Sequence, residues 1–469
     1  MKKFWEKHDL VKIAGIMVLF TVLLTWIIPQ GYWSGSELTI TEITRVGIFD
    51  FFTYGLLGMY YFTVLVTFLF VLGGFYQVLG KTGGYQKLTD SIAKKLKGKE
   101  IVFTLVVSFI IAALTAVVND YFIILTFLPF VITILSKMKL DKITGLATTF
   151  GSVLVGIIGS VYSAKIVGWN VSNLGTDYNS FLWVKLVLFA TSFIIFSVLN
   201  VLHIRKNLKV KKADQINEIF VSEEVTKKTK IWPVVTIFVS FILISILAYL
   251  PWETVFKVGI FATATEWVKT VEILGAPIFS YILGSIESFG AFGSWDLFGI
   301  QTLMILATLL LKWAYKINWN DYLTAFGEGF KKSAKLVVIL LLVYNILEFS
   351  VMFPVIPTII DWIMSLTSKF NVVLGTIAGF IPSLFSVEYQ YTVQLVGNYF
   401  VTTYADFASQ FPILLQATYG LAMFFTPASF VLLMGLSYLD VSYKDWLKYI
   451  WKFLIAMFVI IVILMLIIF

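Results

Sequence analysis

The stretch TAVVNDYFIIL, residues 115–125, places an Asn-Asp pair in the middle of a long apolar segment. From Ile101 to Leu135, Asp120 is the only charged residue. A charged side chain at the centre of a lipid bilayer costs about 3 kcal/mol or more. The position of this pair therefore has to be explained by the way in which the surrounding chain crosses the membrane.

The composition is that of a polytopic membrane protein. Of 469 residues, 59% are hydrophobic and 13% are charged, which leaves little polar surface to face water. Apolar stretches of about 20 residues, the length that crosses a hydrocarbon core of about 30 Å as a helix, recur from Leu10 to Phe469. The sequence therefore predicts an all-α polytopic membrane protein of the cell membrane.

The residue types present exclude several functional classes. The chain has no cysteine and two histidines, so it lacks the ligands of a thiolate or histidine metal site and cannot form disulfides. No HExxH or GxSxG motif occurs, so neither an enzyme nor a cofactor is expected. The net charge of +8 comes from lysines that flank apolar stretches, where they act as topology signals and do not indicate a nucleic-acid partner.

Two lysine-rich loops orient the chain in the membrane. Residues 81–100 carry six lysines against two acids, and residues 136–142 carry three against one. Because short loops rich in Lys and Arg stay in the cytoplasm, both loops and the N-terminus are predicted to be cytoplasmic, whereas the acid-leaning loop 29–50 is placed outside. The predicted organisation is an N-terminal membrane half (1–203), a cytoplasmic linker (204–230) and a C-terminal membrane half (231–469).

This threading explains the Asn-Asp pair. The 35 residues from Ile101 to Leu135 must enter the membrane and return to the same side, yet two full crossings need about 40 residues. A single helix of this length would be about 50 Å long. A re-entrant helical hairpin with its tip at Asn119 and Asp120 fits best, and such a tip requires a polar cavity around it. The alternative is an outside turn in which Asn-Asp serves turn chemistry.

Further polar residues interrupt other apolar segments. Lys165 follows a run of glycines and serines and is either a helix end that reaches toward water or the basic group of a site. In the second half, one apolar helix carries two polar residues three positions apart, another span carries a proline with polar neighbours, and a third is broken by a Thr-Pro pair. These candidates are Asn345, Glu348, Pro382, Ser383, Glu388, Gln390, Thr426, Pro427 and Ser429.

Two stretches carry a family resemblance. The sequences LGGFYQVLGKTGGYQKLTDSIAKKLKGKE (72–100) and FFTPASFVLLMGLSYLDVSYKDWLKYIWKF (424–453) resemble the YfcC-like branch of the anaerobic C4-dicarboxylate carrier family, which also holds arginine/ornithine-type exchangers. The resemblance implies the ion-transporter superfamily fold, in which two inverted repeats each contribute a re-entrant hairpin and a discontinuous helix. By position, the hairpin residues would be Asn119 and Asp120, and the two Pro-Ser loops would contain Pro382, Ser383, Thr426, Pro427 and Ser429.

The chain departs from the family pattern in two respects. Leu384 and Phe385 stand where the family is glycine-rich, and Ala428 and Phe430 replace the expected Thr and Gly. Inverted repeats also require an odd number of crossings in each half, whereas the lysine-based threading gives four in the first. Either one boundary is misplaced or one segment is split.

We therefore expect a secondary active transporter that moves a small carboxylate-bearing metabolite by alternating access, coupled to Na⁺, to H⁺ or to exchange. The acids Asp120, Glu348 and Glu388 outnumber Lys165 among the candidate buried charges, which favours an amino acid, including a basic one, over a C4-dicarboxylate. A C4-dicarboxylate transporter, a channel and a non-transporting membrane scaffold are the alternatives. The expected partners are the substrate and the lipid bilayer, and a homodimer is left open.

Overall fold

The computed structural model describes residues 9–209, 216, 229–283 and 290–469. Within these ranges, eight helices are long and apolar enough to cross a membrane. They are α2 (Asp9–Ile27), α4 (Thr63–Lys81), α6 (Glu100–Val117), α11 (Leu182–Lys209), α12 (Trp232–Tyr249), α15 (Leu297–Ala314), α16 (Trp319–Met352) and α23 (Tyr443–Ile468). The predicted all-α class is confirmed.

Several of these helices expose large apolar side chains on their outer faces. Phe109 on α6, Leu202 on α11 and Ile463 on α23 are each about half exposed or more. Helices that are hydrophobic all round face either a protein core or lipid. The exposed rows therefore mark a surface that hydrocarbon covers.

Each half of the chain contains a hairpin and a discontinuous helix. The first half continues from α4 with α5 (Gly84–Lys95), the hairpin arms α6 and α7 (Leu128–Lys137), and a discontinuous helix made of α8 (Lys142–Leu146), α9 (Ser152–Ile158) and α10 (Trp169–Leu174). The second half continues from α16 with α17 (Ile356–Met364) and a hairpin. The first arm of this hairpin is α18 (Val372–Phe385), and the second arm contains α19 (Tyr389–Thr392) and α20 (Asn398–Thr403). The discontinuous helix that follows is made of α21 (Phe411–Ala422) and α22 (Phe430–Leu439).

The two halves pack in matching ways. Helix α6 packs on α9 as α18 packs on α21, and α11 packs on α9 as α23 packs on α21. Likewise, α15 lies against α4 as α2 lies against α16. These correspondences pair α2 with α15, α4 with α16, and α11 with α23. The fold is therefore a duplicated one, as predicted.

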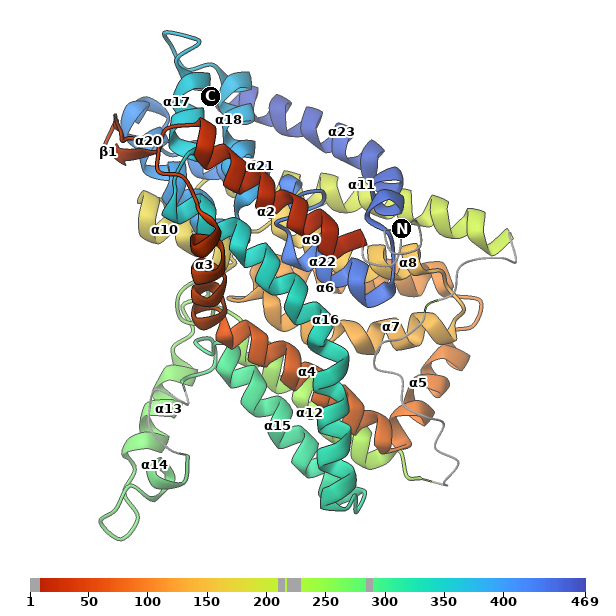
Figure 1. The fold of residues 1–469 in the computed structure, drawn as a ribbon. Coiled ribbons are helices and arrows are strands. Elements are labelled where there is room, and N and C mark those ends of the chain that lie inside the picture. Colours follow the sequence, from red (N-terminus) through yellow and green to blue (C-terminus); the bar gives the residue numbers. More distant parts are fainter. Residues whose placement is uncertain (1–8, 210–215, 217–228, 284–289) are drawn as a thin grey trace.

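The paired helices α4 and α16 run antiparallel along each other (Figure 1). The ring of Phe62 stacks on Tyr344, and further along α4 the ring of Phe70 stacks on Phe330. Ser333 Oγ donates a hydrogen bond of 2.9 Å to the carbonyl of Leu69 between them. Because equivalent helices run in opposite directions, the second unit is inverted relative to the first.

Helix α12 stands apart from the paired helices. It packs on α15 and α5 but has no counterpart in the pairing of the described helices. In the chain it lies between the last helix of the first unit, α11, and the first helix of the second, α15. The number of crossings in each half stays a prediction.

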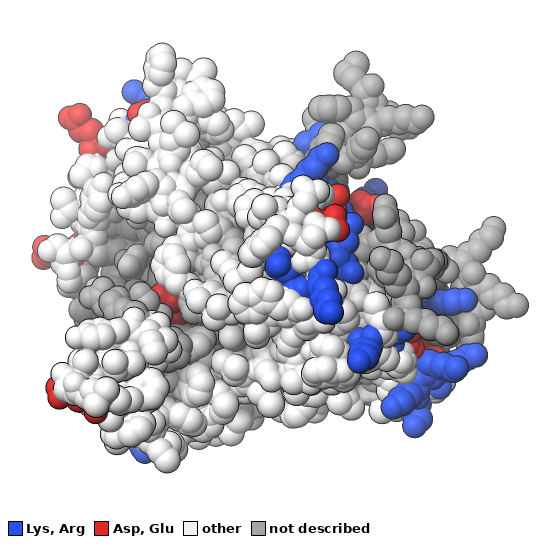
Figure 2. All heavy atoms as spheres, turned by 90° about the horizontal axis from the view of Figure 1, so that it is seen from below, with Lys and Arg blue, Asp and Glu red and all other residues white. Residues whose placement is uncertain are grey.

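The first hairpin begins and ends at one end of the molecule, as the lysine counts predicted. Lys137 at the end of α7 forms an ion pair of 2.5 Å with Asp90 on α5, and Lys142 Nζ lies 3.3 Å from Asp440 Oδ2. Lys and Arg side chains gather at this lysine-rich end, at the right of Figure 2. Of the predicted linker, residues 210–215 and 217–228 lie outside the described residues, and α11 extends past residue 204 to Lys209.

The loop 29–50 lies at the opposite end and contains a two-stranded antiparallel sheet, β1 (Gly31–Ser34) and β2 (Glu37–Ile40). It is followed by α3 (Ile48–Tyr61). The N–H of Gly31 donates to the carbonyl of Pro354, 3.0 Å away, which ties this loop to the second half. Two short helices, α13 (Ile260–Thr270) and α14 (Ile278–Leu283), project from the body (Figure 1).

Candidate functional site

The tip of the first hairpin is residues 118–120, between α6 and a 3-10 turn at Tyr121–Thr126. Asp120 has an extended backbone, and its side chain accepts a hydrogen bond of 2.9 Å from the N–H of Phe122. Asn119 donates its N–H to the carbonyl of Tyr249 at 2.9 Å, and its side-chain amide donates to the carbonyl of Gly293. The end of α12 and the loop after it therefore hold the tip in place.

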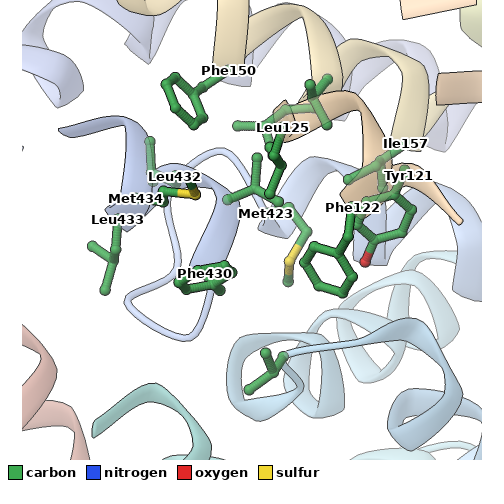
Figure 3. Packing of buried hydrophobic residues seen from close by; sticks show 14 of the residues in the cluster. Tyr121, Phe122, Leu125, Phe150, Ile157, Met423, Phe430, Leu432, Leu433 and Met434 are labelled. Atoms are coloured by element: carbon green, nitrogen blue, oxygen red, sulfur yellow. The ribbon is translucent and has the colours of Figure 1, made fainter. Parts of the chain in front are cut away.

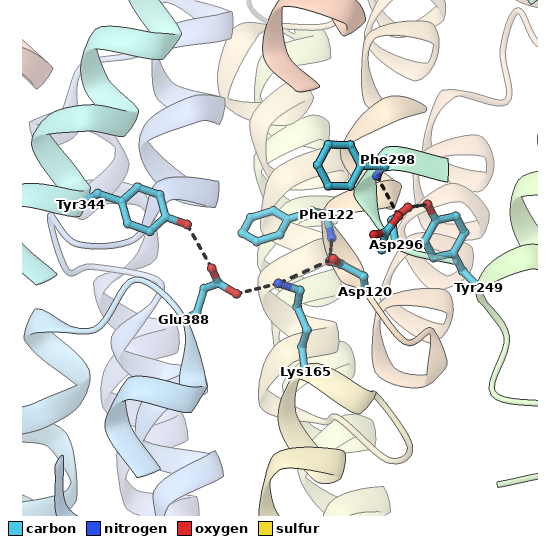
Figure 4. Close-up of polar contacts among 8 residues, drawn as sticks. All are labelled: Asp120, Phe122, Lys165, Tyr249, Asp296, Phe298, Tyr344 and Glu388. Atoms are coloured by element: carbon cyan, nitrogen blue, oxygen red, sulfur yellow. Dashed lines mark hydrogen bonds and ion pairs between the residues drawn. The ribbon is translucent and has the colours of Figure 1, made fainter. Parts of the chain in front are cut away.

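Lys165 lies between the tips of the two hairpins (Figure 4). Its Nζ is 2.6 Å from Glu388 Oε2 and 3.6 Å from Asp120 Oδ2. It also lies 4.8 Å from the centre of the Phe122 ring, a distance at which a cation is attracted to an aromatic face. The three side chains, with 23%, 13% and 11% of their surface exposed for Lys165, Asp120 and Glu388, form what we call the charged triad.

The three residues of the charged triad come from different structural elements. Lys165 lies just after the break of the first discontinuous helix, at 159–163, and Glu388 directly precedes the second arm of the second hairpin. Asp120 occupies the equivalent position before the second arm of the first hairpin. With all three groups ionised, the triad carries one net negative charge. It can therefore accept a carboxylate at Lys165 or a cation at either acid.

Tyrosines that the sequence did not single out complete the surroundings. Tyr344 on α16 donates a hydrogen bond of 3.0 Å to Glu388 Oε1. Tyr419 on α21 donates to the carbonyl of Val387 at 3.0 Å, and Tyr389 donates to Asn170 Oδ1 at 2.7 Å. The signal available in the sequence was a tyrosine within an apolar span, as at Tyr344, one helical turn before Glu348. Aromatic residues are common in such spans, so this signal is weak.

Apolar side chains pack behind the first tip and around the second break. Phe122 and Phe430 lie 6.2 Å apart between ring centres, and Figure 3 shows them with Tyr121 and Met423. All four belong to the buried core. Charges in such surroundings interact more strongly than in water because the local dielectric is low.

The second discontinuous helix is broken at 423–429. Thr426 Oγ1 donates a hydrogen bond of 2.6 Å to the carbonyl of Leu384 on α18 and accepts one of 3.1 Å from the N–H of Ala428. Ser429 caps α22 by accepting a bond from the N–H of Leu432. Thr426, Pro427 and Ser429 thus lie together in the break, and Thr426 connects it to the second hairpin.

Pro382 and Ser383 lie elsewhere than the resemblance implied. Both belong to the helical arm α18, and Ser383 Oγ bonds back to the carbonyl of Gly379 at 2.9 Å. The tip itself is residues 386–388, and Gln390 follows it in α19. The implied loop at Pro382 is therefore wrong, because the membrane helix continues through the proline and ends one turn later.

Asn345 and Glu348 lie apart from the triad contacts. They face Gly55 and Gly58 on α3, where a Cβ on Gly58 would lie 3.5 Å from Asn345 Oδ1 and 3.6 Å from Glu348 Cγ. No hydrogen bond or ion pair joins either residue to the triad within the described chain. Asn345 and Glu348 are therefore not part of the charged triad and lie at the contact between α16 and α3.

Groups that could bind a metal ion through three His, Asp or Glu side chains are absent from the described residues. Buried hydroxyls do occur near the triad. The Oγ atoms of Ser160 and Ser163, at the first break, have no hydrogen-bond partner among the described residues. These oxygens are suited to a hard cation such as Na⁺ or to a polar substrate group.

Comparisons with known proteins identify the family. The sequence profile of the DcuC family, described as C4-dicarboxylate anaerobic carrier, matches residues 8–387. No curated protein sequence matches the chain at a significant level. One solved structure that matches the chain is the YdaH transporter of Alcanivorax borkumensis, described as having an unusual topology; it is 13% identical, the match covers 97% of this chain and 98% of that one, and the TM-score is 0.45. The profile spans most of the chain, including Asp120 and Lys165, so this multi-pass membrane protein belongs to the C4-dicarboxylate anaerobic carrier family.

Proposed function

We propose that this chain is a secondary active transporter that moves a small carboxylate-bearing metabolite by alternating access, with the charged triad at its substrate site. The observation that carries the proposal is the position of Lys165, which is paired with acids at both hairpin tips. Each tip belongs to a different inverted unit. A shift of one unit against the other would change the pairing of Lys165, and so would a bound carboxylate.

C4-dicarboxylates are the first substrate class, because the family profile carries that description. One substrate carboxylate would displace Glu388 or Asp120 from Lys165 Nζ. The second would enter a site that already has excess negative charge. Electrostatic balance would then require a co-transported cation or the protonation of one acid, so the proposed transport is coupled to Na⁺ or H⁺ or proceeds as exchange.

Amino acids, including basic ones, are the second class, and the charge of the triad favours them. An α-carboxylate would pair with Lys165 while an ammonium group pairs with Glu388 or Asp120. A basic amino acid brings a second cation, so that each of the three carboxylates in the site would then have a cationic partner. Aspartate is a useful probe because it is both a four-carbon dicarboxylate and an amino acid. The YfcC-like branch, with its exchangers, is part of this second proposal.

The proposal also includes the orientation of the protein in the membrane. The lysine-rich end would face the cytoplasm, with the N-terminus on that side and the β1–β2 loop outside. The division into two membrane halves joined by a cytoplasmic linker also remains a proposal, and the packing of α12 favours starting the second repeat after it. A homodimer is left open.

Uptake into proteoliposomes tests the function. We expect saturable uptake and counterflow of labelled succinate, aspartate or arginine by the purified protein. Binding of the same compound should raise the melting temperature, because a ligand of the native state adds RT ln(1 + [L]/Kd) to stability. Unsaturable flux without counterflow would indicate a channel. If none of these compounds were bound or transported, the result would favour a membrane scaffold and contradict the proposal.

A further inference from the structure

Helix α16 carries a second buried acid one turn beyond Tyr344. Glu348 is 5% exposed, and its carboxyl group forms no ion pair or hydrogen bond with the described residues. The neighbouring Asn345 is 7% exposed, and its Oδ1 has no hydrogen-bond partner in the same part of the chain. Buried charges and amides are normally paired, so the unpaired carboxylate of Glu348, which lines a cavity, indicates a ligand at that place.

Helix α3 presents the glycines Gly55 and Gly58 to Asn345 and Glu348. At Gly55, a Cβ would lie 3.5 Å from Asn345 Nδ2, which is an ordinary van der Waals distance, so the two helices are in contact here. Glycines at a helix contact allow the backbones to approach closely. Beyond this contact, Glu348 lines a cavity.

That cavity has a volume of about 310 Å³ and is lined by Glu348 together with the rings of Tyr61, Phe62 and Tyr391. The rings come from α3, from the residue that joins α3 to α4, and from the start of the second arm of the second hairpin. The remaining lining is aliphatic. A carboxylate surrounded by aromatic faces attracts cations and disfavours anions. The volume is at the lower limit for small-molecule pockets, so the ligand is small.

We propose that this cavity is a binding site for an organic cation with a primary ammonium or guanidinium head group. The head group forms a charged hydrogen bond with Glu348 and lies against the faces of Phe62 and Tyr391. A carboxylate is not required on the ligand, because the described lining offers no cationic side chain. The site is therefore distinct from the charged triad and goes beyond the proposed transport of carboxylates.

The cavity and the triad nevertheless share two walls. Phe62 lines the cavity and stacks on Tyr344, with 3.4 Å between ring centres, and Tyr344 donates to Glu388. Tyr391 lines the cavity three residues after Glu388 on the same hairpin. A cation in the cavity and a substrate at the triad would thus contact the same hairpin. Occupancy of one site is expected to change the affinity of the other.

Binding of methylguanidinium to the purified protein tests the proposal without any transport measurement. We expect methylguanidinium chloride to raise the melting temperature more than sodium chloride at the same ionic strength. Glu348→Gln should weaken methylguanidinium binding, measured by calorimetry, by roughly tenfold or more, the value of a charged hydrogen bond. Glu348→Asp retains the charge and should bind more tightly than Glu348→Gln. Tyr391→Phe should bind like the parent, whereas Tyr391→Leu should bind more weakly.

Glu328→Gln is the matched control, because Glu328 is an exposed acid on the same helix, and it should leave binding unchanged. Parent-like binding by Glu348→Gln would overturn the proposal. The proposal would also be overturned if Glu388→Gln lost methylguanidinium binding while Glu348→Gln retained it. That result would assign the cation to the charged triad. Equal stabilisation by sodium and methylguanidinium would overturn the organic-cation assignment. Since these readouts concern binding alone, they separate failure of this site from failure of the transport proposal.

Discussion

Lys165 Nζ and Glu388 Oε2 lie 2.6 Å apart although the two residues are 223 positions apart in sequence and belong to different inverted units. Lys165 lies in the first turn after the break of the first discontinuous helix, and Glu388 directly precedes the second arm of the second hairpin. A buried ion pair is weak evidence for stability, since its attraction is offset by desolvation. It does fix the relative position of the two elements, and a ligand that enters between them has to break it.

The first prediction concerns the energetics of this pair. Lys165→Met should lower the free energy of unfolding by roughly 3–5 kcal/mol, because it leaves two buried acids without a cation. Lys165→Met combined with Glu388→Gln should recover most of that loss, since one of the two charges left behind is neutralised. Denaturant melts of both variants measure the difference. Lys137→Met, which removes an ion pair to an Asp90 side chain that is 66% exposed, should cost less than about 1 kcal/mol. An additive loss in the double variant would show that the pair is not coupled.

The second prediction concerns the hairpin tip. Asp120→Asn keeps an oxygen that can accept from the N–H of Phe122, and Lys165 keeps Glu388, so stability should change by about 1 kcal/mol or less. Uptake should fall roughly tenfold or more, because the triad loses a charge that a cation or an ammonium group would use. Initial uptake rates and melting temperature are measured together. Normal uptake would show that Asp120 serves turn geometry alone.

The third prediction concerns the second break. Thr426→Val is close in shape but removes both hydrogen bonds of Oγ1, leaving the carbonyl of Leu384 and the N–H of Ala428 buried without it. Stability should fall by about 1–3 kcal/mol, and uptake should fall as the break loses its connection to the second hairpin. Thr426→Ser retains the hydroxyl and should behave like the parent. If valine and serine gave the same result, the hydrogen bonds would have no role.

The fourth prediction concerns orientation. The native chain has no cysteine, so single substitutions report cleanly on sidedness. Ser91→Cys, at the lysine-rich end, should react with an impermeant thiol reagent only after the membrane is opened. Ser36→Cys, in the exposed turn between β1 and β2, should react in intact cells. The reverse pattern would invert the proposed topology.

The sequence was sufficient for features that depend on length and local polarity. The first hairpin followed from a segment too short for two crossings, and the residues at its tip were identified because a charge within an apolar segment is conspicuous. Charge counts likewise placed the loops 81–100 and 136–142 at the same end of the molecule. Each of these inferences uses only neighbours along the chain.

Contacts between distant residues could not be predicted in this way. Nothing near Lys165 in sequence indicates that its partner is Glu388, and nothing near Asn119 indicates that the carbonyls of Tyr249 and Gly293 hold the tip. Pro382 suggested a loop, yet the helix continues past it because a membrane helix tolerates proline when its surroundings satisfy the freed carbonyl. Glu348 was grouped with the other acids by residue type, although its cavity is a separate one.

The most direct test of the central claim is the initial uptake rate of the Lys165→Met and Glu388→Gln double variant in proteoliposomes. Labelled succinate, aspartate and arginine are supplied in parallel, with the parent and Lys137→Met as references. The double variant lacks the pair that joins the two units but should remain folded, so reduced uptake cannot be attributed to unfolding. We predict that it loses uptake of every compound that the parent carries, while Lys137→Met retains it. Parent-like uptake by a double variant with a parent-like melting temperature would contradict the assignment of the charged triad as the substrate site.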